Sequence, residues 1–220
     1  MEDIDAIAVL QDPVRRRLYE YVVAQGREVG RNEAAEGAGV ARTLAAHHLD
    51  RLTEAGLLES GSRRLTGRTG PGAGRPAKVY TRAPAERSVS LPGRDYRTAA
   101  ELLAEAAEEA GLDAGLCAAA RRRGEALRGP EGPGGLEEAV ELLTARGYEP
   151  YLEGGGQAPV VRMRNCPFHA VAERFPPLVC GMNLALLEGL LGADGSVRAR
   201  MDARPGECCV VVEDSKNNDH

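Results

Sequence analysis

The stretch EAAEGAGVARTLAAHHLDRLTEAGLLE, residues 33–59, predicts two helices joined by a tight turn. Gly37 and Gly39 supply the turn, and Gly56 ends the second helix, which is expected over about residues 41–55. The apolar residues of this helix recur at helical spacing, so one of its faces should be buried. The residues expected on that face are Leu44, His48 or Ala45, Leu49 and Leu52.

The flanking segments complete a winged helix-turn-helix. Asp12 can cap a preceding helix that begins at Pro13. After the second helix, residues 57–60 and 77–80 have the composition of two strands, and a Gly-, Pro- and Arg-rich stretch separates them. Two strands around a basic tip, directly after a helix-turn-helix, describe a wing. We therefore predict a winged helix-turn-helix DNA-binding domain over residues 1–82.

The net charge of −5 is unevenly distributed along the chain. Residues 1–82 carry a net charge of +2, and the remainder carries −7. Residues 61–82 contain no acidic side chain, and such a basic patch attracts phosphate even on an acidic protein. Its six cationic residues are Arg63, Arg64, Arg68, Arg75, Lys78 and Arg82. Aromatic residues make up only 4% of the chain, which argues against stacking surfaces for single-stranded nucleic acid.

The N-terminal segment MEDIDAIAVL has acidic side chains where a secretory signal has Lys or Arg. No apolar run approaches the ~18–20 residues that cross a bilayer. We therefore expect a cytoplasmic protein with no membrane partner. Five cysteines in that reducing compartment favour thiolate chemistry or burial over disulfides.

The rest of the chain is expected to form a helical region and a second domain. Residues 83–134 would contain a linker and two Ala/Glu/Arg-rich dimerisation helices between positions 98 and 128. The segment GPEGPGG, which ends at residue 135, is a flexible joint. Residues 135–220 are expected to form a sensor domain with the order α-β-β-α-β-β. The predicted fold class of the whole chain is α+β.

Four of the five cysteines fall in this last segment. Cys166 and His169 lie three residues apart, Cys180 follows Cys166 after thirteen residues, and the pair Cys208-Cys209 follows after twenty-seven more. Thiolate and imidazole are ligands that zinc and iron–sulfur clusters prefer. The spacing therefore predicts a metal site.

Local structure indicates which of these side chains can meet. Pro167 suits the first position of a helix, and the positive end of that helix would favour a thiolate beside His169. Neighbouring residues of a strand point to opposite faces, so only one of Cys208 and Cys209 is expected to join the site. We choose Cys208, and the predicted metal ligands are Cys166, His169, Cys180 and Cys208.

Residues 33–59 resemble the core of the winged-helix repressors of the ArsR type. The shared features are the turn glycines, the His-Leu pair of the second helix and the A-G-L-L exit into the wing. The resemblance implies a homodimer that binds a pseudo-palindromic operator in double-stranded DNA, with one recognition helix in each major groove. His48 is expected to pack against the preceding helix rather than read bases. The implied DNA contacts are Arg42, Thr43, Ala46 and His47 in the groove, and Arg68, Arg75 and Lys78 in the wing.

The spacing C-x13-C-x27-C, together with residues 165–168 and the wing sequence GRPAKVY, is similar to the SufR-like branch of these regulators. That resemblance implies an iron–sulfur cluster that controls DNA binding. A further cysteine of some members would fall near Asp194 and is absent here. Zinc is the alternative cofactor, because three cysteines and one histidine form a closed tetrahedral set. Buried cysteines without a metal are the third possibility.

The sequence therefore favours a transcription regulator whose operator affinity is controlled by a metal or iron–sulfur cluster in the C-terminal domain. The alternative is a winged-helix regulator that binds a small organic effector in a Leu/Val-lined pocket, with purely structural cysteines. Cys166 or Cys180 with His169 could also form a nucleophile–base pair. The sequence lacks a nucleophile elbow, a separate phosphate cradle and paired carboxylates, so we do not expect an enzyme.

Overall fold

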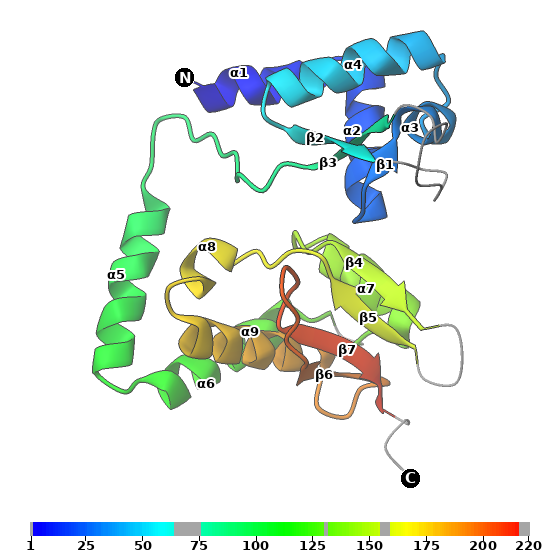
Figure 1. Ribbon diagram of the computed structural model, residues 1–220. Coiled ribbons are helices and arrows are strands. Elements are labelled where there is room, and N and C mark those ends of the chain that lie inside the picture. The colour runs from blue at the N-terminus through cyan, green and yellow to red at the C-terminus, as the bar shows by residue number, and fades with distance from the viewer. Residues whose placement is uncertain (1, 64–75, 130–131, 155–158, 216–220) are drawn as a thin grey trace. The chain divides into compact units, whose positions relative to one another are not determined.

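The computed structural model describes residues 2–63, 76–129, 132–154 and 159–215. Backbone contacts divide the chain into two compact units, Met1–Arg94 and Asp95–His220 (Figure 1). The expected dimerisation helices pack within the second unit instead of forming a region of their own, because α6 and α9 are in extensive contact. Among the residues described, no helix has the length and apolar character needed to cross a membrane.

The first unit is a helical domain with a small antiparallel sheet of order β1-β3-β2. An N-terminal helix and a 3-10 turn precede the helices expected from the sequence. The elements in chain order are α1 (Glu2–Ala8), η1 (Val9–Gln11), α2 (Pro13–Gln25), β1 (Val29–Gly30), α3 (Arg31–Gly37), α4 (Arg42–Glu54), β2 (Leu58–Arg63) and β3 (Ala77–Arg82).

Local capping sets the helix boundaries of this unit. The Asp12 carboxylate accepts the backbone N–H groups of Val14 and Arg15 at 2.9 and 3.0 Å, as predicted for the N-terminus of α2. Gly39 and Gly56 have φ values of 66° and 68°, a region that side chains other than glycine rarely adopt. The turn before α4 and its exit therefore lie where the glycines of the sequence predict them.

The core of the first unit is built from aliphatic side chains of α2, α4 and the sheet. Ala45, His48, Leu49 and Leu52 form the buried face of α4. The prediction was wrong for Leu44, which is 42% exposed. The buried positions follow the spacing i, i+3, i+4 and i+7 from Ala45, and Leu44 lies one residue outside that stripe.

The second unit has an antiparallel sheet of order β4-β5-β7-β6. Helices α7 and α9 pack on one of its faces, where Leu143, Leu187 and Val212 are fully buried in a single apolar core. The helical region expected to begin at Pro167 is the short helix α8, which is separate from α9. The elements are α5 (Tyr96–Glu109), α6 (Asp113–Leu127), α7 (Leu136–Thr144), β4 (Pro150–Glu153), β5 (Val160–Met163), α8 (His169–Ala172), α9 (Pro176–Leu191), β6 (Val197–Met201) and β7 (Val210–Asp214).

Two glycines bring α6 and α9 into backbone contact, and the helices lie side by side in Figure 1. A Cβ atom on Gly124 would lie 2.2 Å from the carbonyl oxygen of Leu186. A Cβ atom on Gly189 would lie 2.2 Å from the carbonyl oxygen of Arg121. Any side chain at either position would force the helices apart.

A buried arginine organises the other face of the sheet. Arg162 of β5 is only 2% exposed, and burial of an unpaired guanidinium would be very unfavourable. Its Nε lies 2.8 Å from Glu153 Oε2, and its Nη2 lies 2.6 Å from Asp202 Oδ2. These ion pairs join β4, β5 and the segment after β6.

Candidate DNA-reading helix and thiol cluster

Helix α4 presents a polar face opposite its buried stripe. Arg42, Thr43 and His47 are exposed on this face, and Ala46 is half-buried. An exposed arginine can bind guanine through two hydrogen bonds, and small side chains can pack against a thymine methyl group. The helix therefore places four of the predicted DNA contacts where a DNA groove could reach them.

His48 is a structural histidine in this unit. Its Nδ1 atom accepts a hydrogen bond from Arg15 Nε at 3.3 Å, and Arg15 Nη1 donates to the Val9 carbonyl at 3.0 Å. Burial lowers the pKa of His48, so its imidazole is kept neutral and able to accept that bond. Arg15 and His48 consequently join η1, α2 and α4.

Acidic partners from other segments hold two of the basic side chains around the wing. Lys78 Nζ lies 2.7 Å from Asp50 Oδ1, which also accepts a hydrogen bond from Tyr80 Oη at 3.0 Å. Arg63 Nη1 lies 3.0 Å from Glu28 Oε2.

These ion pairs change the interpretation of the predicted wing contacts. Lys78 joins β3 to helix α4 through Asp50. The sequence had predicted a Lys78 side chain that is free to contact phosphate. The acids were missed because they lie outside residues 61–82. Arg68 and Arg75, the other predicted wing contacts, lie outside the described residues.

In the second unit, Cys208 is buried in the apolar core, Cys166 and Cys209 pack against that core, and Cys180 lies on α9. We call Cys166, Cys180, Cys208 and Cys209 the thiol cluster. Cys208 is almost fully buried and the other three are half-buried. All four are free thiols that come from the loop after β5, from α9 and from the bend before β7. Segments separated by as many as 43 residues, from Cys166 to Cys209, therefore supply one group of sulfurs.

The thiols form a chain of contacts centred on Cys208. Hydrogen bonds with the Cys166 and Cys209 thiols lower the pKa of Cys208. The same hydrogen bonds, followed by burial, raise the pKa values of Cys166 and Cys209. Cys209 also forms a hydrogen bond with Cys180. These contacts therefore favour proton loss at Cys208 over proton loss at Cys166 and Cys209.

A buried polar relay supports Cys208 from the side of the core. The Asn183 side chain, fully buried in α9, donates from Nδ2 to Cys208 Sγ at 3.4 Å. Its Oδ1 atom accepts the Tyr148 hydroxyl at 2.5 Å. Both polar ends of Asn183 are therefore used, and its amide is oriented toward the sulfur. The sequence analysis missed this residue, because it lies inside an apolar helical segment.

The structure corrects two of the local predictions for the cysteine site. Pro167 lies in a turn, and the following helix α8 has only four residues, so Cys166 is not at the N-terminus of a long helix. Strand β7 starts at Val210, so Cys208 and Cys209 lie in the bend before it and are not subject to strand alternation. This bend lets both thiols join the cluster, where the sequence predicted only Cys208.

His169 does not face the thiol cluster. Its side chain is 68% exposed, and its Nε2 atom lies 3.2 Å from Glu173 Oε1 one turn further along. In the described segments, no three His, Cys, Asp or Glu side chains surround a point where a single metal ion would already be held. The donor set nevertheless has suitable chemistry, because four thiolates match the ligands of zinc and of iron–sulfur clusters.

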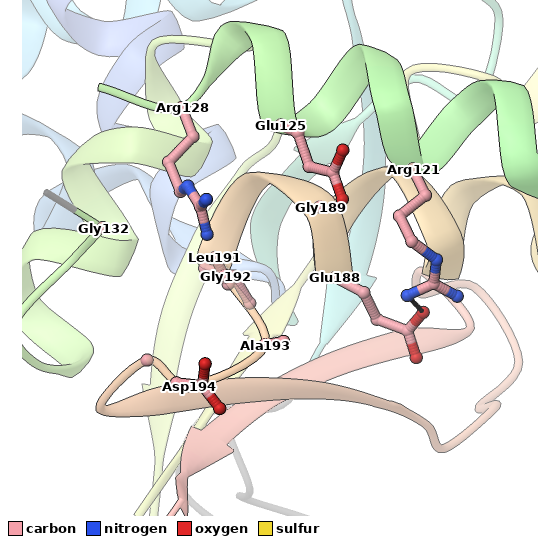
Figure 2. Close-up of a pocket in the computed structure, with 11 residues that line it drawn as sticks. Arg121, Glu125, Arg128, Gly132, Glu188, Gly189, Leu191, Gly192, Ala193 and Asp194 are labelled. Carbon is pink, nitrogen blue, oxygen red and sulfur yellow. Dashed lines mark ion pairs between the residues drawn. The ribbon is translucent and has the colours of Figure 1, made fainter. Parts of the chain in front are cut away.

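A hollow of about 380 Å³ lies between α6, α9 and the loop after α9 (Figure 2). Arg121 and Glu188 form an ion pair of 2.7 Å at its edge, and Arg128, Glu125 and Asp194 also line it. Its walls are therefore charged and glycine-rich, which differs from the Leu/Val-lined effector pocket considered from the sequence.

The comparison with known protein families agrees with the architecture of the first unit. Residues 10–61 match a helix-turn-helix domain family, which is a winged, ArsR-like family. No curated protein and no solved structure matches the chain. The chain therefore has an N-terminal helix-turn-helix domain, which indicates a DNA-binding transcription regulator.

Proposed function

We propose that the protein is a transcription regulator that binds operator DNA through α4 and senses an iron–sulfur cluster through its thiol cluster. The proposal is supported by the pairing of a helix-turn-helix with a second unit in which Cys166 and Cys208 border one apolar core and Cys180 lies on α9, a helix of that core. When bound, an iron–sulfur cluster would supply sensitivity to oxidants and to iron availability. Zinc is the alternative occupant of the same thiols.

The DNA-reading part of the proposal is tested by two arginines of α4. Arg42 is exposed on the polar face, and Arg51 is exposed on the same helix but paired with Glu54 at 2.7 Å. We expect Arg42→Ala to weaken binding to a selected operator by about 1–3 kcal/mol, the usual size of a base-contact loss. Arg51→Ala removes the same charge and should have a smaller effect. Equal losses in fluorescence anisotropy titrations would contradict the proposed reading face.

Apolar packing within the second unit links the thiol cluster to α5. Phe168, two residues after Cys166, packs in a small apolar cluster with Phe175 and Leu178, and Ala104 and Ala107 of α5 pack against the same cluster. An ion pair between Arg174 and Glu101 adds a second link. Helix α5 starts directly after the first unit, so a change at the thiols could reach the segment that leads to the DNA-binding domain.

We also propose that α5 mediates homodimerisation. Tyr96, Ala99, Leu103 and Ala106 form an exposed apolar seam, distinct from the face that carries Ala104. Their alternating spacing of three and four residues is that of a helix pairing with another helix. One α4 helix reads one half-site, so a second copy of the chain is the partner that a two-fold operator requires.

The dimer proposal can be tested with two matched leucines. Leu103 of the seam is 73% exposed and Leu152 of β4 is 50% exposed. We expect Leu103→Glu to convert a dimer to a monomer in sedimentation equilibrium, whereas Leu152→Glu should leave the dimer intact. A monomeric wild-type protein, or dissociation by both variants, would refute the role of α5.

The sensing part is tested on protein purified without oxygen or chelator. We expect iron and sulfide in the protein and a visible absorption band, with both lost in Cys166→Ser. Operator affinity should differ between the loaded and the cluster-free protein, and Cys166→Ser should abolish that difference. Colourless protein with zinc would favour the alternative occupant. Metal-free protein with unchanged DNA binding would favour structural cysteines.

A further inference from the structure

We infer that the charged hollow between α6, α9 and the loop after α9 binds a small basic amino acid, with its carboxylate on Arg128 and its two cationic groups on Glu125 and Asp194. The inference is carried by an arginine and two carboxylates that line one hollow and have no partner within the described part of the chain. It goes beyond the proposed function and does not depend on it, because none of the described lining residues is a cysteine or belongs to the first unit.

Arg128 is the group that would bind the carboxylate of the ligand. It is half-buried directly after the last residue of α6, and its side chain lies against Gly192. Its guanidinium makes no hydrogen bond or ion pair with any described residue. Each of the other buried or half-buried arginines described in this unit contacts a carbonyl, a carboxylate or an aromatic ring; these are Arg146, Arg162, Arg164, Arg198 and Arg200. A guanidinium can pair with both oxygens of a carboxylate, so Arg128 offers a recessed and unused site for one.

Two carboxylates line the same hollow. Glu125 precedes Arg128 by three residues, so their side chains are neighbours on the surface of α6. Figure 2 shows both side chains extending from α6 toward the loop that carries Asp194. Neither carboxylate has a side-chain partner among the residues described, and Glu125 and Arg128 do not pair with each other. Charges of both signs are therefore available to one ligand.

The balance of these charges indicates the class of ligand. Arg121 and Glu188 neutralise each other in an ion pair of 2.7 Å at the edge of the hollow. Arg128, Glu125 and Asp194 then leave one positive and two negative charges, which a ligand with one carboxylate and two cationic groups would complement. The C-terminal end of α9 borders the hollow and also favours a cation. A basic amino acid such as lysine has this set of charges, and about 380 Å³ is within the usual range for small-molecule sites.

The loop after α9 gives the hollow its shape without a ligand. Gly192 has a φ value of 91°, which other residues rarely adopt, and a Cβ atom there would lie 2.1 Å from Arg128 Nη1. A side chain at this position would therefore displace the guanidinium. The Ser215 hydroxyl donates to the Gly195 carbonyl at 2.8 Å, which holds the loop beside Asp194 in place. The binding groups are thus positioned in advance, which lowers the cost of ordering them on binding.

Isothermal titration calorimetry of the full chain with L-lysine tests the site. Two analogues each lack one charged group, because cadaverine has no carboxylate and L-norleucine has no side-chain ammonium. We expect lysine to bind and each analogue to bind at least about tenfold more weakly, the usual loss for one hydrogen-bonded contact between charged groups.

Three variants assign the contacts to residues. Arg128→Met and Asp194→Asn should each weaken lysine binding at least about tenfold, and Arg128→Met should leave the weaker cadaverine binding unchanged. Arg122→Met is the matched control, because Arg122 is exposed on α6 and does not line the hollow. Circular dichroism would verify folding, and Asp194→Asn alters an exposed loop residue, so it tests the site even if Arg128→Met does not fold.

The outcomes are independent of operator and cluster binding, because the titrations use neither DNA nor iron. The inference is overturned if the wild-type chain shows no saturable binding of lysine, or if cadaverine or norleucine binds as tightly as lysine does. It is also overturned if Arg122→Met weakens lysine binding as much as Arg128→Met and Asp194→Asn do. Each of these results would leave the proposed function standing, and failure of the proposed function would leave the amino acid site standing.

Discussion

His48 in the first unit and Cys208 in the second are both buried polar side chains, but their surroundings differ. His48 accepts a hydrogen bond from Arg15, and burial keeps its imidazole neutral. Cys208 is surrounded by two more thiols and by the amide of Asn183. The His48 imidazole has its hydrogen-bond partner within the chain, whereas the thiols around Cys208 could bind a metal ion or a cluster.

The two units also differ in how their elements are held together. Caps and glycine turns within a few residues of each helix define the first unit. The second unit depends on contacts between distant segments, such as the α6–α9 crossing and the ion pairs of Arg162. We therefore expect the stability of the DNA-binding unit to depend mainly on substitutions at its caps and turns. The stability of the second unit should depend mainly on substitutions at contacts between distant segments.

The largest effect is expected from Arg162→Met. Removal of one partner from a buried ion pair commonly costs about 3–5 kcal/mol, and we expect roughly 3 kcal/mol because Glu153 and Asp202 keep some access to water. Arg204→Ala removes an exposed partner of the same Glu153 and should cost under about 1 kcal/mol. Hydrogen exchange should show destabilisation of the second unit only. Similar losses in the two variants would mean that burial of Arg162 is unimportant.

The next effect is expected from Gly189→Ala in α9. The added methyl would collide with the Arg121 backbone, and overpacking of this kind costs about 1–3 kcal/mol. Gly115→Ala in α6 is the matched control, because a Cβ atom there meets nothing within 4 Å. That control should be neutral or slightly stabilising. Thermal unfolding followed by circular dichroism would measure both, and a stable Gly189→Ala protein would exclude the close crossing.

A smaller effect is expected from the helix caps. Asp12→Ala should destabilise the first unit by about 1 kcal/mol, because two backbone N–H groups of α2 lose their acceptor. Asp95→Ala removes one such bond, to the Thr98 N–H of the exposed helix α5, and should cost less. Urea unfolding would measure the difference. An Asp95→Ala loss larger than that of Asp12→Ala would contradict the view that local caps matter most in the first unit.

The smallest effect concerns pH. The pKa of His48 is lowered in the folded chain, so the unfolded state takes up a proton near pH 6.5 that the folded state does not. The stability contributed by neutral His48 is therefore complete above that pH and falls as the pH decreases through it. Urea midpoints measured between about pH 7.5 and 5.5 should show this loss, and His48→Gln should reduce it. His47→Gln, which alters an exposed neighbour, is the control, and an unchanged slope in His48→Gln would refute the assignment.

Local signals made much of the first unit predictable. The cap at Asp12, the glycine turns and the strands on both sides of the wing depend on residues close in sequence, and the structure places them as expected. The prediction that Leu44 is buried was wrong. Helical periodicity predicts that one face of the helix is buried, but it does not determine which residues lie at the border of that face.

By itself, the sequence determined the helix-turn-helix and the spacing of the cysteines, because helix periodicity, caps and turns act over a few residues. Only the tertiary structure decided which side chains meet. It turned His169 toward Glu173, paired Lys78 with Asp50, buried Arg162 and brought Cys209 to the other thiols. These outcomes depend on loops, bends and strand pairing that join segments far apart along the chain, and no local pattern records where such segments come together.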